Sequence, residues 1–269
     1  MLTAEKIARF RANGFLNGGL LLSDDELEVL RNELERVIND KDKSDVRQPL
    51  SITNLAGDDE APVSQIVNIW KASEPYKKLA AHPDITKGIA QLTDATALRI
   101  WHDQIQYKPS EIGVVNMWHQ DAPLWPIIAP MTEVTAWIAL DDADESSGCM
   151  SMVPGSHLWG NNIDLLQELE NYEAMPANFS GHRIDVERCP VRAGEVHFHH
   201  SLTWHGSHAN TSGRPRRAIA LHYMTQDARY VASGDHVMKP YVNVNDGELM
   251  SGDAFPLVYP VLRSFDGTF

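Results

Sequence analysis

Two short segments of the chain carry residue types that bind transition metals. The first reads Trp-His-Gln-Asp at 118–121, so His119 and Asp121 stand two positions apart. In a β-strand, residues two apart point to the same face. A second histidine, His205, opens the other segment. Two histidines and one carboxylate on one face form the triad that holds ferrous iron in non-haem oxygenases. The two segments together predict an iron site with these three residues as ligands.

Several histidines compete with His205 for the place of third ligand. His199 would share its face only if the chain stayed regular through 201–203, which the composition disfavours. His208 has the wrong parity relative to Arg216, so it should face the other way in an alternating segment. The alternatives to His205 are four: His197, His199, His200 and His208.

The residues that follow His205 predict a β-hairpin that would bring an arginine close to the metal. Residues 210–215 read Asn-Thr-Ser-Gly-Arg-Pro, which is typical of a turn. If Ala209 pairs with Arg216, then His205, Ser207 and Arg216 share one face. A buried guanidinium needs an anion, and a dicarboxylate could supply one through a bidentate contact. The same segment offers two alternative arginines: Arg214 in the turn and Arg217 on the opposite face.

These segments resemble the phytanoyl-CoA dioxygenase family of Fe(II)- and 2-oxoglutarate-dependent oxygenases. The likeness rests on four stretches of sequence and extends over nearly the whole chain: Asn-Gly-Phe at 13–15, Trp-His-Gln-Asp at 118–121, Asp-Asp-Ala…Gly…Val-Pro-Gly-Ser-His at 141–157 and His-Gly-Ser…Asn-Thr-Ser…Arg-x-Ala at 205–218. It implies iron(II), with 2-oxoglutarate and dioxygen as cosubstrates. It also implies that Arg216, assisted by Ser207, binds the far carboxylate of 2-oxoglutarate.

The resemblance implies two more cosubstrate contacts, Trp137 and Gln104. From the residues alone, Trp137 is most simply a core aromatic in an alternating strand. The family often has an apolar residue where this chain has Gln104. A lysine that some members use has no clear counterpart here. Lys71 is nearby but out of register, and we leave it unassigned.

From residue 97 onward the apolar pattern alternates with a period of two, which predicts strands. We expect eight of them: 97–107, 114–120, 133–141, 149–153, 195–200, 202–209, 216–225 and 236–244. Eight short strands in succession indicate a jelly roll. The resemblance implies the same double-stranded β-helix, which is cupin-like. The fold class is therefore mainly β with flanking helices.

The first 93 residues predict helices that pack on this core. Thr3 can cap a helix that runs to Asn13 and ends at Gly14, and Ser23 can begin a second. Short helices at 74–81 and 83–92 and a short strand at 66–70 should follow. We expect one domain over 1–269, with a jelly-roll core at 95–269. The loop at 40–63 and the insertion at 158–182 are either solvated segments or covers over the site.

Composition narrows the class of protein. The net charge of −14 argues against nucleic acid or an anionic membrane surface as a partner. The two cysteines, Cys149 and Cys189, imply no disulfide framework and fit a reducing cytoplasm. The first residues lack the apolar core of a signal peptide, and no run of about 18 apolar residues occurs, so we expect neither a signal peptide nor a transmembrane helix. The expected partner is a small, partly apolar substrate.

These observations favour a hydroxylase that converts 2-oxoglutarate to succinate and carbon dioxide while it oxidises a small organic molecule. A carboxylate at position 121, where halogenating relatives have a small residue, argues against halogenation and leaves hydroxylation, desaturation and ring rearrangement. Two rival classes are a zinc-dependent hydrolase or isomerase on the same barrel, and a barrel that binds a small molecule without catalysis. The zinc class would not need Arg216 on the metal-facing side, and the intact triad argues against the binding barrel.

Overall fold

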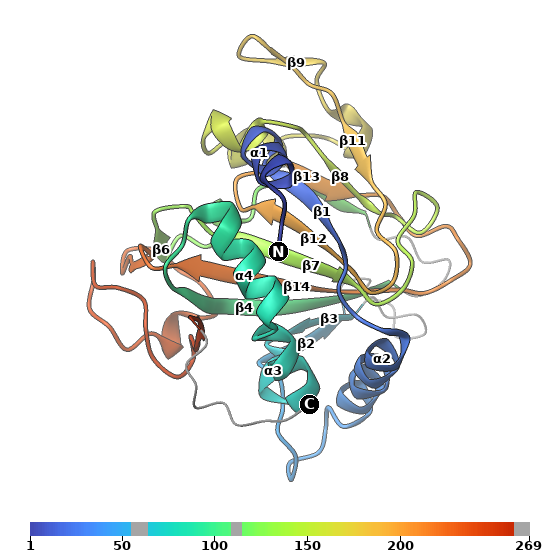
Figure 1. The fold of residues 1–269 in the computed structure, drawn as a ribbon, viewed down its shortest axis with the longest axis vertical. Helices are drawn as coiled ribbons and strands as arrows, with labels where there is room; N and C mark the ends of the chain where they lie inside the picture. Colours follow the sequence, from blue (N-terminus) through green and yellow to red (C-terminus); the bar gives the residue numbers. More distant parts are fainter. Residues whose placement is uncertain (55–63, 109–114, 261–269) are drawn as a thin grey trace.

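The computed structural model describes residues 1–54, 64–108 and 115–260. Within these ranges the strands form two main antiparallel sheets, labelled in Figure 1, and residues of both sheets line one pocket. The larger sheet has the order β1-β12-β7-β14-β4-β3-β2, with β16 also paired to β4, and the smaller has the order β11-β8-β13-β5. The predicted jelly roll is confirmed.

The strands of the larger sheet are β1 (Phe15–Leu20), β2 (Ser51–Asn54), β3 (Ser64–Val67), β4 (Leu98–Lys108), β7 (Val134–Ala139), β12 (Glu195–His200), β14 (Arg216–Thr225) and β16 (Leu257–Tyr259). Those of the smaller sheet are β5 (Asn116–His119), β8 (Met150–Met152), β11 (Glu187–Cys189) and β13 (His205–Ser207). Two small pairs join β6 (Ile128–Ala129) to β15 (Arg229–Tyr230) and β9 (Asn178–Phe179) to β10 (His182–Arg183). The α-helices are α1 (Ala4–Asn13), α2 (Asp24–Asn39), α3 (Glu74–Ala80), α4 (Pro83–Thr93) and α5 (Ile163–Gln167). The 3₁₀ helices are η1 (Ile69–Lys71), η2 (Ala122–Leu124), η3 (Ser156–Trp159), η4 (Tyr172–Ala174) and η5 (Lys239–Tyr241).

Seven of the eight predicted strands are present, and the eighth is wrong. Residues 236–244 contain η5 in place of a strand. Pro240 lies inside this 3₁₀ helix, and a proline cannot donate to a strand ladder. Strand β1 was not predicted, because its Asn-Gly-Gly sequence at 17–19 has low β propensity. It forms through pairing with β12, with a register shift between Asn17 and Gly19.

The first helix begins and ends where the sequence predicts, and the second begins where predicted. The side chain of Thr3 accepts a hydrogen bond from the backbone of Lys6, and Ser23 forms a capping box with Glu26. Gly14 ends α1 with φ of 84°, in the left-handed region that glycine adopts without strain. The predicted strand at 66–70 is only partly right. Strand β3 stops at Val67 and η1 follows.

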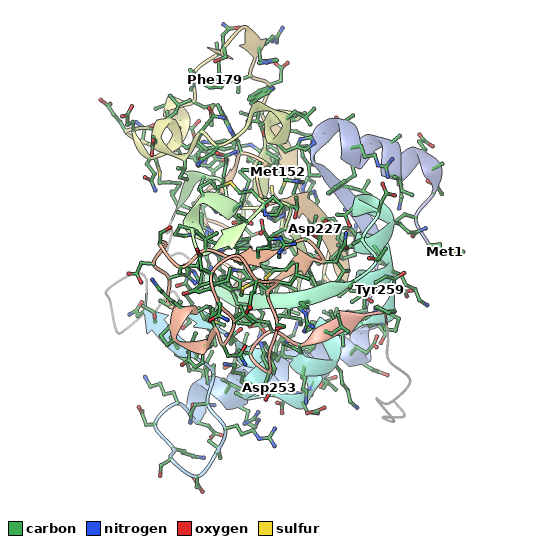
Figure 2. The ribbon with its side chains drawn as sticks, turned by 90° about the vertical axis from the view of Figure 1, so that its left-hand side faces the viewer. Met1, Met152, Phe179, Asp227, Asp253 and Tyr259 are labelled. Carbon is green, nitrogen blue, oxygen red and sulfur yellow. The ribbon has the colours of Figure 1, made fainter. Side chains whose placement is uncertain are left out.

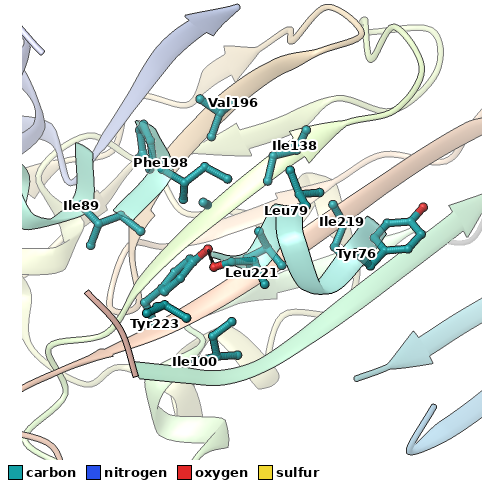
Figure 3. Packing of buried hydrophobic residues seen from close by; sticks show 14 of the residues in the cluster. Tyr76, Leu79, Ile89, Ile100, Ile138, Val196, Phe198, Ile219, Leu221 and Tyr223 are labelled. Atoms are coloured by element: carbon teal, nitrogen blue, oxygen red, sulfur yellow. Dashed lines mark hydrogen bonds between the residues drawn. The ribbon is translucent and has the colours of Figure 1, made fainter. Parts of the chain in front are cut away.

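The main apolar core lies between the helices and the outer face of the larger sheet. Helix α2 buries one stripe of side chains, made of Leu27, Leu30, Leu34 and Val37. From the sheet, Ile138, Phe198 and Ile219 point to the same layer, as Figure 3 shows. Because these outward residues alternate with inward ones, the opposite side chains of the same strands line the space between the two sheets.

The insertion at 158–182 covers the outer face of the smaller sheet. Leu166 and Tyr172 pack in one cluster with Trp118 and Trp204, and the Trp118 indole donates to the carbonyl of Tyr172 at 2.8 Å. In Figure 2, Phe179 projects from the end of the molecule opposite to Asp253. No described residue of the insertion lines the pocket between the sheets. The insertion is therefore neither a freely solvated loop nor a cover over that pocket.

Of the other predicted loop, at 40–63, residues 51–54 form β2, and residues 55–63 lie outside the described residues. Among the described helices, none has the length and apolar character needed to cross a bilayer.

Candidate metal centre and cosubstrate pocket

The three predicted metal ligands meet at one end of the smaller sheet. His119 ends β5, and His205 opens β13 as its direct cross-strand partner. Asp121 follows β5 at the start of η2, so a tight turn, and not a continued strand, brings it beside the histidines. The ligand atoms of the three residues all lie within 4.8 Å of one another. Oδ1 of Asp121 is 3.7 Å from Nε2 of His119 and 3.6 Å from Nε2 of His205.

Both histidines are held in the tautomer that a metal requires. Nδ1–H of His119 donates to the carbonyl of Met117 at 2.7 Å, and Nδ1–H of His205 donates to the carbonyl of Thr203 at 2.9 Å. Each Nε2 is therefore left with a free lone pair. Burial, and then the neighbouring His205, lowers the pKa of His119 to about 4, and burial also lowers the pKa of His205. Neutral imidazoles at neutral pH can bind a cation. Their chemistry fits iron(II), which accepts two imidazoles and a carboxylate on one face.

The four competing histidines occupy other places. His199 lies next to Asp121 but contacts the other carboxylate oxygen, Oδ2, at 3.3 Å. His197 stacks on Phe15 beside a different cavity. The two remaining residues lie by other side chains: His200 by His157, and His208 by Tyr172 and Glu173.

The predicted hairpin is wrong, although the residues it was meant to unite do share a pocket. His205 pairs with His119 and Met152 in the smaller sheet, whereas Arg216 begins a strand of the larger sheet. The turn composition correctly indicates a reversal: the side-chain amide of Asn210 donates to the carbonyl of Arg214 at 2.6 Å. The loop, however, crosses from one sheet to the other. His205 and Arg216 therefore line the same pocket from opposite sheets.

Arg216 is a buried cation with no acidic partner in the part of the chain that the structure describes. Its side chain is among the largest that are fully buried, and Nε and Nη2 have no hydrogen-bond partner among the described residues. Burial lowers its pKa to about 10, so it stays charged at neutral pH. Both alternative arginines already have acids: Arg214 with Asp144 at 2.7 Å, and Arg217 with Asp141 at 2.8 Å. Because an unpaired buried charge is costly, Arg216 is the arginine placed to receive a bound anion.

A second buried basic side chain, Lys108, was not identified from the sequence. It is the cross-strand partner of Arg216, and its Nζ donates to Oγ of Ser207 and to the carbonyl of His208, each at 3.0 Å. Burial, together with the charge of Arg216, lowers its pKa to about 6. The lysine that the resemblance led us to seek near Lys71 thus has a candidate in β4. Lys71 itself lies over the rings of Trp70 and Tyr241.

The remaining predicted contacts face the same pocket. Trp137 presents its ring to the Arg216 guanidinium at 5.7 Å and pairs across strands with Ala220. Gln104 also pairs with Ala220, from the other side, and lies four positions before Lys108 on the inner face of β4. The small alanine leaves space between these larger side chains. Farther along, the pocket is bordered by carboxamides and apolar groups: Gln65, Gln106, Asn116, Leu124 and Trp125.

Residues 10–218 match the model of the phytanoyl-CoA dioxygenase family. The chain belongs to this family. The predicted family is thus confirmed, and with it the class of enzyme, an oxygenase. The match includes all three candidate ligands as well as Lys108 and Arg216.

Individual relatives are similar to this protein over most of its length. Rat peroxisomal phytanoyl-CoA dioxygenase is 25% identical over 249 residues, which cover 86% of this chain and 71% of the rat protein. Ectoine dioxygenase of Stutzerimonas stutzeri is 26% identical over 237 residues, covering 82% and 76%. Among solved structures, the non-haem α-ketoglutarate-dependent carbocyclase SnoK of nogalamycin biosynthesis has a TM-score of 0.74 and 28% identity, covering 95% of this chain and 96% of SnoK.

Proposed function

We propose that this member of the family is an Fe(II)- and 2-oxoglutarate-dependent dioxygenase that hydroxylates a small organic molecule and releases succinate and carbon dioxide. One observation carries the proposal. Three converging ligand atoms and a buried guanidinium that has no acid beside it among residues 1–54, 64–108 and 115–260 line the same pocket from opposite sheets. A dicarboxylate that also binds a metal matches both ends of such a pocket.

His119, Asp121 and His205 are the residues we assign to the metal. The carbonyls of Met117 and Thr203 orient the two imidazoles, which lowers the cost of ordering the site when the cation binds. When bound, iron(II) supplies the oxidative chemistry by activating dioxygen at the expense of 2-oxoglutarate. The carboxylate of Asp121 occupies the place that halide would need, so hydroxylation is favoured over halogenation.

Arg216, Ser207 and Lys108 are the residues we assign to the far carboxylate of 2-oxoglutarate. The guanidinium offers two unused donor atoms, Nε and Nη2, which suit a bidentate contact. Lys108 adds an amine that already donates a hydrogen bond to Ser207. Trp137 and Gln104 are proposed to bound the cosubstrate on the sheet side, where Ala220 leaves the space for it.

Each rival class explains only part of the pocket. A zinc hydrolase would account for the three ligands but not for two adjacent buried basic side chains that lack an acid among the described residues. A barrel that only binds a small molecule would account for the basic side chains but not for two histidines held in the metal-binding tautomer. Both features together are what an oxygenase that consumes 2-oxoglutarate requires.

Several coarser expectations complete the proposal. We propose a single domain over 1–269, with the helices of residues 1–93 packed on the core. The core does not begin at residue 95 as expected, because β1, β2 and β3 belong to its larger sheet. The two cysteines are unpaired and buried, which suits a reducing compartment such as the cytoplasm. The net charge of −14 favours a small molecule over nucleic acid or an anionic membrane surface.

The proposal is tested by following succinate. Purified protein, ferrous iron, ascorbate and ¹³C-labelled 2-oxoglutarate are incubated in air, and labelled succinate is measured by mass spectrometry with and without a metabolite extract. We expect slow succinate formation alone and faster formation with extract, accompanied by a product 16 mass units heavier than its substrate. His205→Ala is the control and should form none. Equal succinate from wild type and His205→Ala would reject the proposal.

A further inference from the structure

The two oxygens of the Asp121 carboxylate have different surroundings. Oδ1 faces the Nε2 atoms of His119 and His205 at 3.7 and 3.6 Å. Oδ2 points away from them and accepts hydrogen bonds from Oγ1 of Thr135 at 3.1 Å and from Nε2 of His199 at 3.3 Å. One oxygen is thus free toward the candidate metal, and the other is anchored to the protein.

The anchoring groups form one cross-strand row of the larger sheet. In the register of β12, β7 and β14, His199 pairs with Thr135, and Thr135 pairs with His222. All three side chains are buried and face inward. Asp121 itself comes from the end of β5 in the smaller sheet. The row therefore joins the larger sheet to the ligand that the smaller sheet supplies.

The number of hydrogens on each group determines which group donates and which accepts in these hydrogen bonds. An ionised carboxylate only accepts, so Thr135 must donate its single hydroxyl hydrogen to Asp121. The hydroxyl oxygen then accepts from Nδ1–H of His222, which lies 2.8 Å away. His199 must donate through Nε2–H, and its Nδ1 has no hydrogen-bond partner among the described residues. A nitrogen that carries this hydrogen cannot bind a metal as well, which separates His199 from the two candidate ligands.

We propose that Thr135 and His199 are positioning residues that hold the Asp121 carboxylate by Oδ2, so that it offers the metal Oδ1 alone. The inference rests on the proposed function and adds residues to the same site. A carboxylate that binds through one oxygen fills one coordination position. If it turned and bound through both, it would take a position that the cosubstrate or dioxygen needs. The hydrogen bonds to Oδ2 prevent that rotation.

Cobalt(II) tests this role without turnover, because its visible absorption responds to the number and arrangement of its ligands. Two variants remove the donors, Thr135→Val and His199→Phe, and two retain them, Thr135→Ser and His199→Gln. We expect the first two to weaken cobalt binding by about 10- to 100-fold, the usual effect of losing a partner of a metal ligand. They should also change the cobalt spectrum with saturating 2-oxoglutarate, and the second two should restore both properties.

A matched control is Thr132→Val, whose hydroxyl pairs with that of Thr225 at 3.0 Å away from the ligands. It should bind cobalt like the wild type. Thermal unfolding of the metal-free proteins shows which variants fold. If His199→Phe does not, Thr135→Val, which keeps a similar shape, decides the question. Wild-type affinity and an unchanged spectrum in Thr135→Val would overturn the positioning role. A wild type that bound no cobalt and formed no succinate would instead refute the proposed function.

Discussion

Lys108 and Arg216 are neighbours on adjacent strands, and neither has an acidic partner within the described residues. Two positive charges buried side by side repel each other, so the weaker base, Lys108, loses its proton more easily. Burial and Arg216 lower the pKa of Lys108 to about 6, so it is mostly neutral at pH 7 while Arg216 is charged. A carboxylate entering between them would raise the pKa of Lys108 again. Binding of 2-oxoglutarate should therefore take up a proton.

This coupling predicts a pH dependence at the residue scale. Below pH 6, Lys108 is already protonated and the affinity for 2-oxoglutarate should be nearly constant. Above pH 6, the affinity should fall by up to about tenfold per pH unit, because each binding event must also protonate the amine. Calorimetric titration at pH 6, 7 and 8 in two buffers measures both affinity and proton uptake. Lys108→Met should bind more weakly and lose the slope. An identical slope in that variant would assign it to another group.

The sequence identified the site residues that lie in recognisable short motifs. His119, Asp121 and Arg216 belong to short motifs in which the residue types alone suggest a metal or an anion. Lys108 was not found, because an isolated lysine at the end of a strand normally reaches solvent. Only the pairing of β4 with β14, which no local pattern specifies, places it beside Arg216. The sequence did contain one indication: Lys108 lies four positions after Gln104, so both side chains point to the same face of the strand.

At the scale of elements, Gln120 connects the ligand-bearing turn to two other segments. It stands between the two ligands of the first motif, with its side chain buried. Nε2 donates to the carbonyls of Gly160 and Leu202 at 2.9 and 2.7 Å, and Oε1 accepts from the backbone of Asn162 at 2.6 Å. The insertion and the segment before β13 are thereby tied to the end of β5. We interpret the insertion as a brace, that is, a segment that stabilises the ligand-bearing turn from the outer side of the smaller sheet.

Gln120→Ala tests this brace. Three hydrogen bonds are lost, and the carbonyl of Leu202 and the N–H of Asn162 lose their partner, so the free energy of unfolding should fall by about 1–3 kcal/mol. Because the turn that carries Asp121 is loosened, iron(II) affinity should fall as well. Urea unfolding and iron titration measure the two effects. Gln167→Ala, an exposed position on α5, is the control and should change neither. Loss of stability with wild-type iron affinity would show that the brace is purely structural.

The predicted hairpin between His205 and Arg216 was wrong for a physical reason. A turn-rich segment indicates that the chain reverses, but it carries no information on which sheet the next strand joins. In this fold the strands before and after the turn enter opposite sheets. The period-two pattern still determined which side chains face inward. The predicted inward orientation of His205, Ser207 and Arg216 was therefore correct, although the predicted strand pairing was wrong.

At the scale of the whole molecule, the helices stabilise the larger sheet from outside while its inner face remains available for the site. The alternation of each strand was readable from the sequence, because it depends on neighbouring residues. The strand order, with β1 at one edge and β2 at the other, depends on contacts between distant segments and was not predicted. Stability and chemistry therefore reside on opposite faces of the same strands and should be separable by mutation.

Leu34→Ala tests this separation. The side chain is fully buried between α2 and the sheet, and its truncation leaves a cavity. The free energy of unfolding should fall by about 2–5 kcal/mol, while iron(II) affinity at a temperature where the variant stays folded should be unchanged. Val29→Ala, a half-exposed position on the same helix, should cost less than about 0.5 kcal/mol. A parallel loss of iron affinity in Leu34→Ala would show that the two faces are coupled.

The proposed function requires that a metal and a dicarboxylate occupy one pocket. The most direct measurement is an anaerobic titration of 2-oxoglutarate into the iron(II) protein, followed by the charge-transfer absorbance that appears when a keto acid binds the metal. The wild type should show a saturable band, and His205→Ala should show none. Arg216→Ala should need about 10²- to 10³-fold more 2-oxoglutarate, from the roughly 3–5 kcal/mol lost when one partner of a buried charge pair is removed. No band in the wild type, or a wild-type titration in Arg216→Ala with weakened binding in Arg214→Ala or Arg217→Ala, would contradict the account.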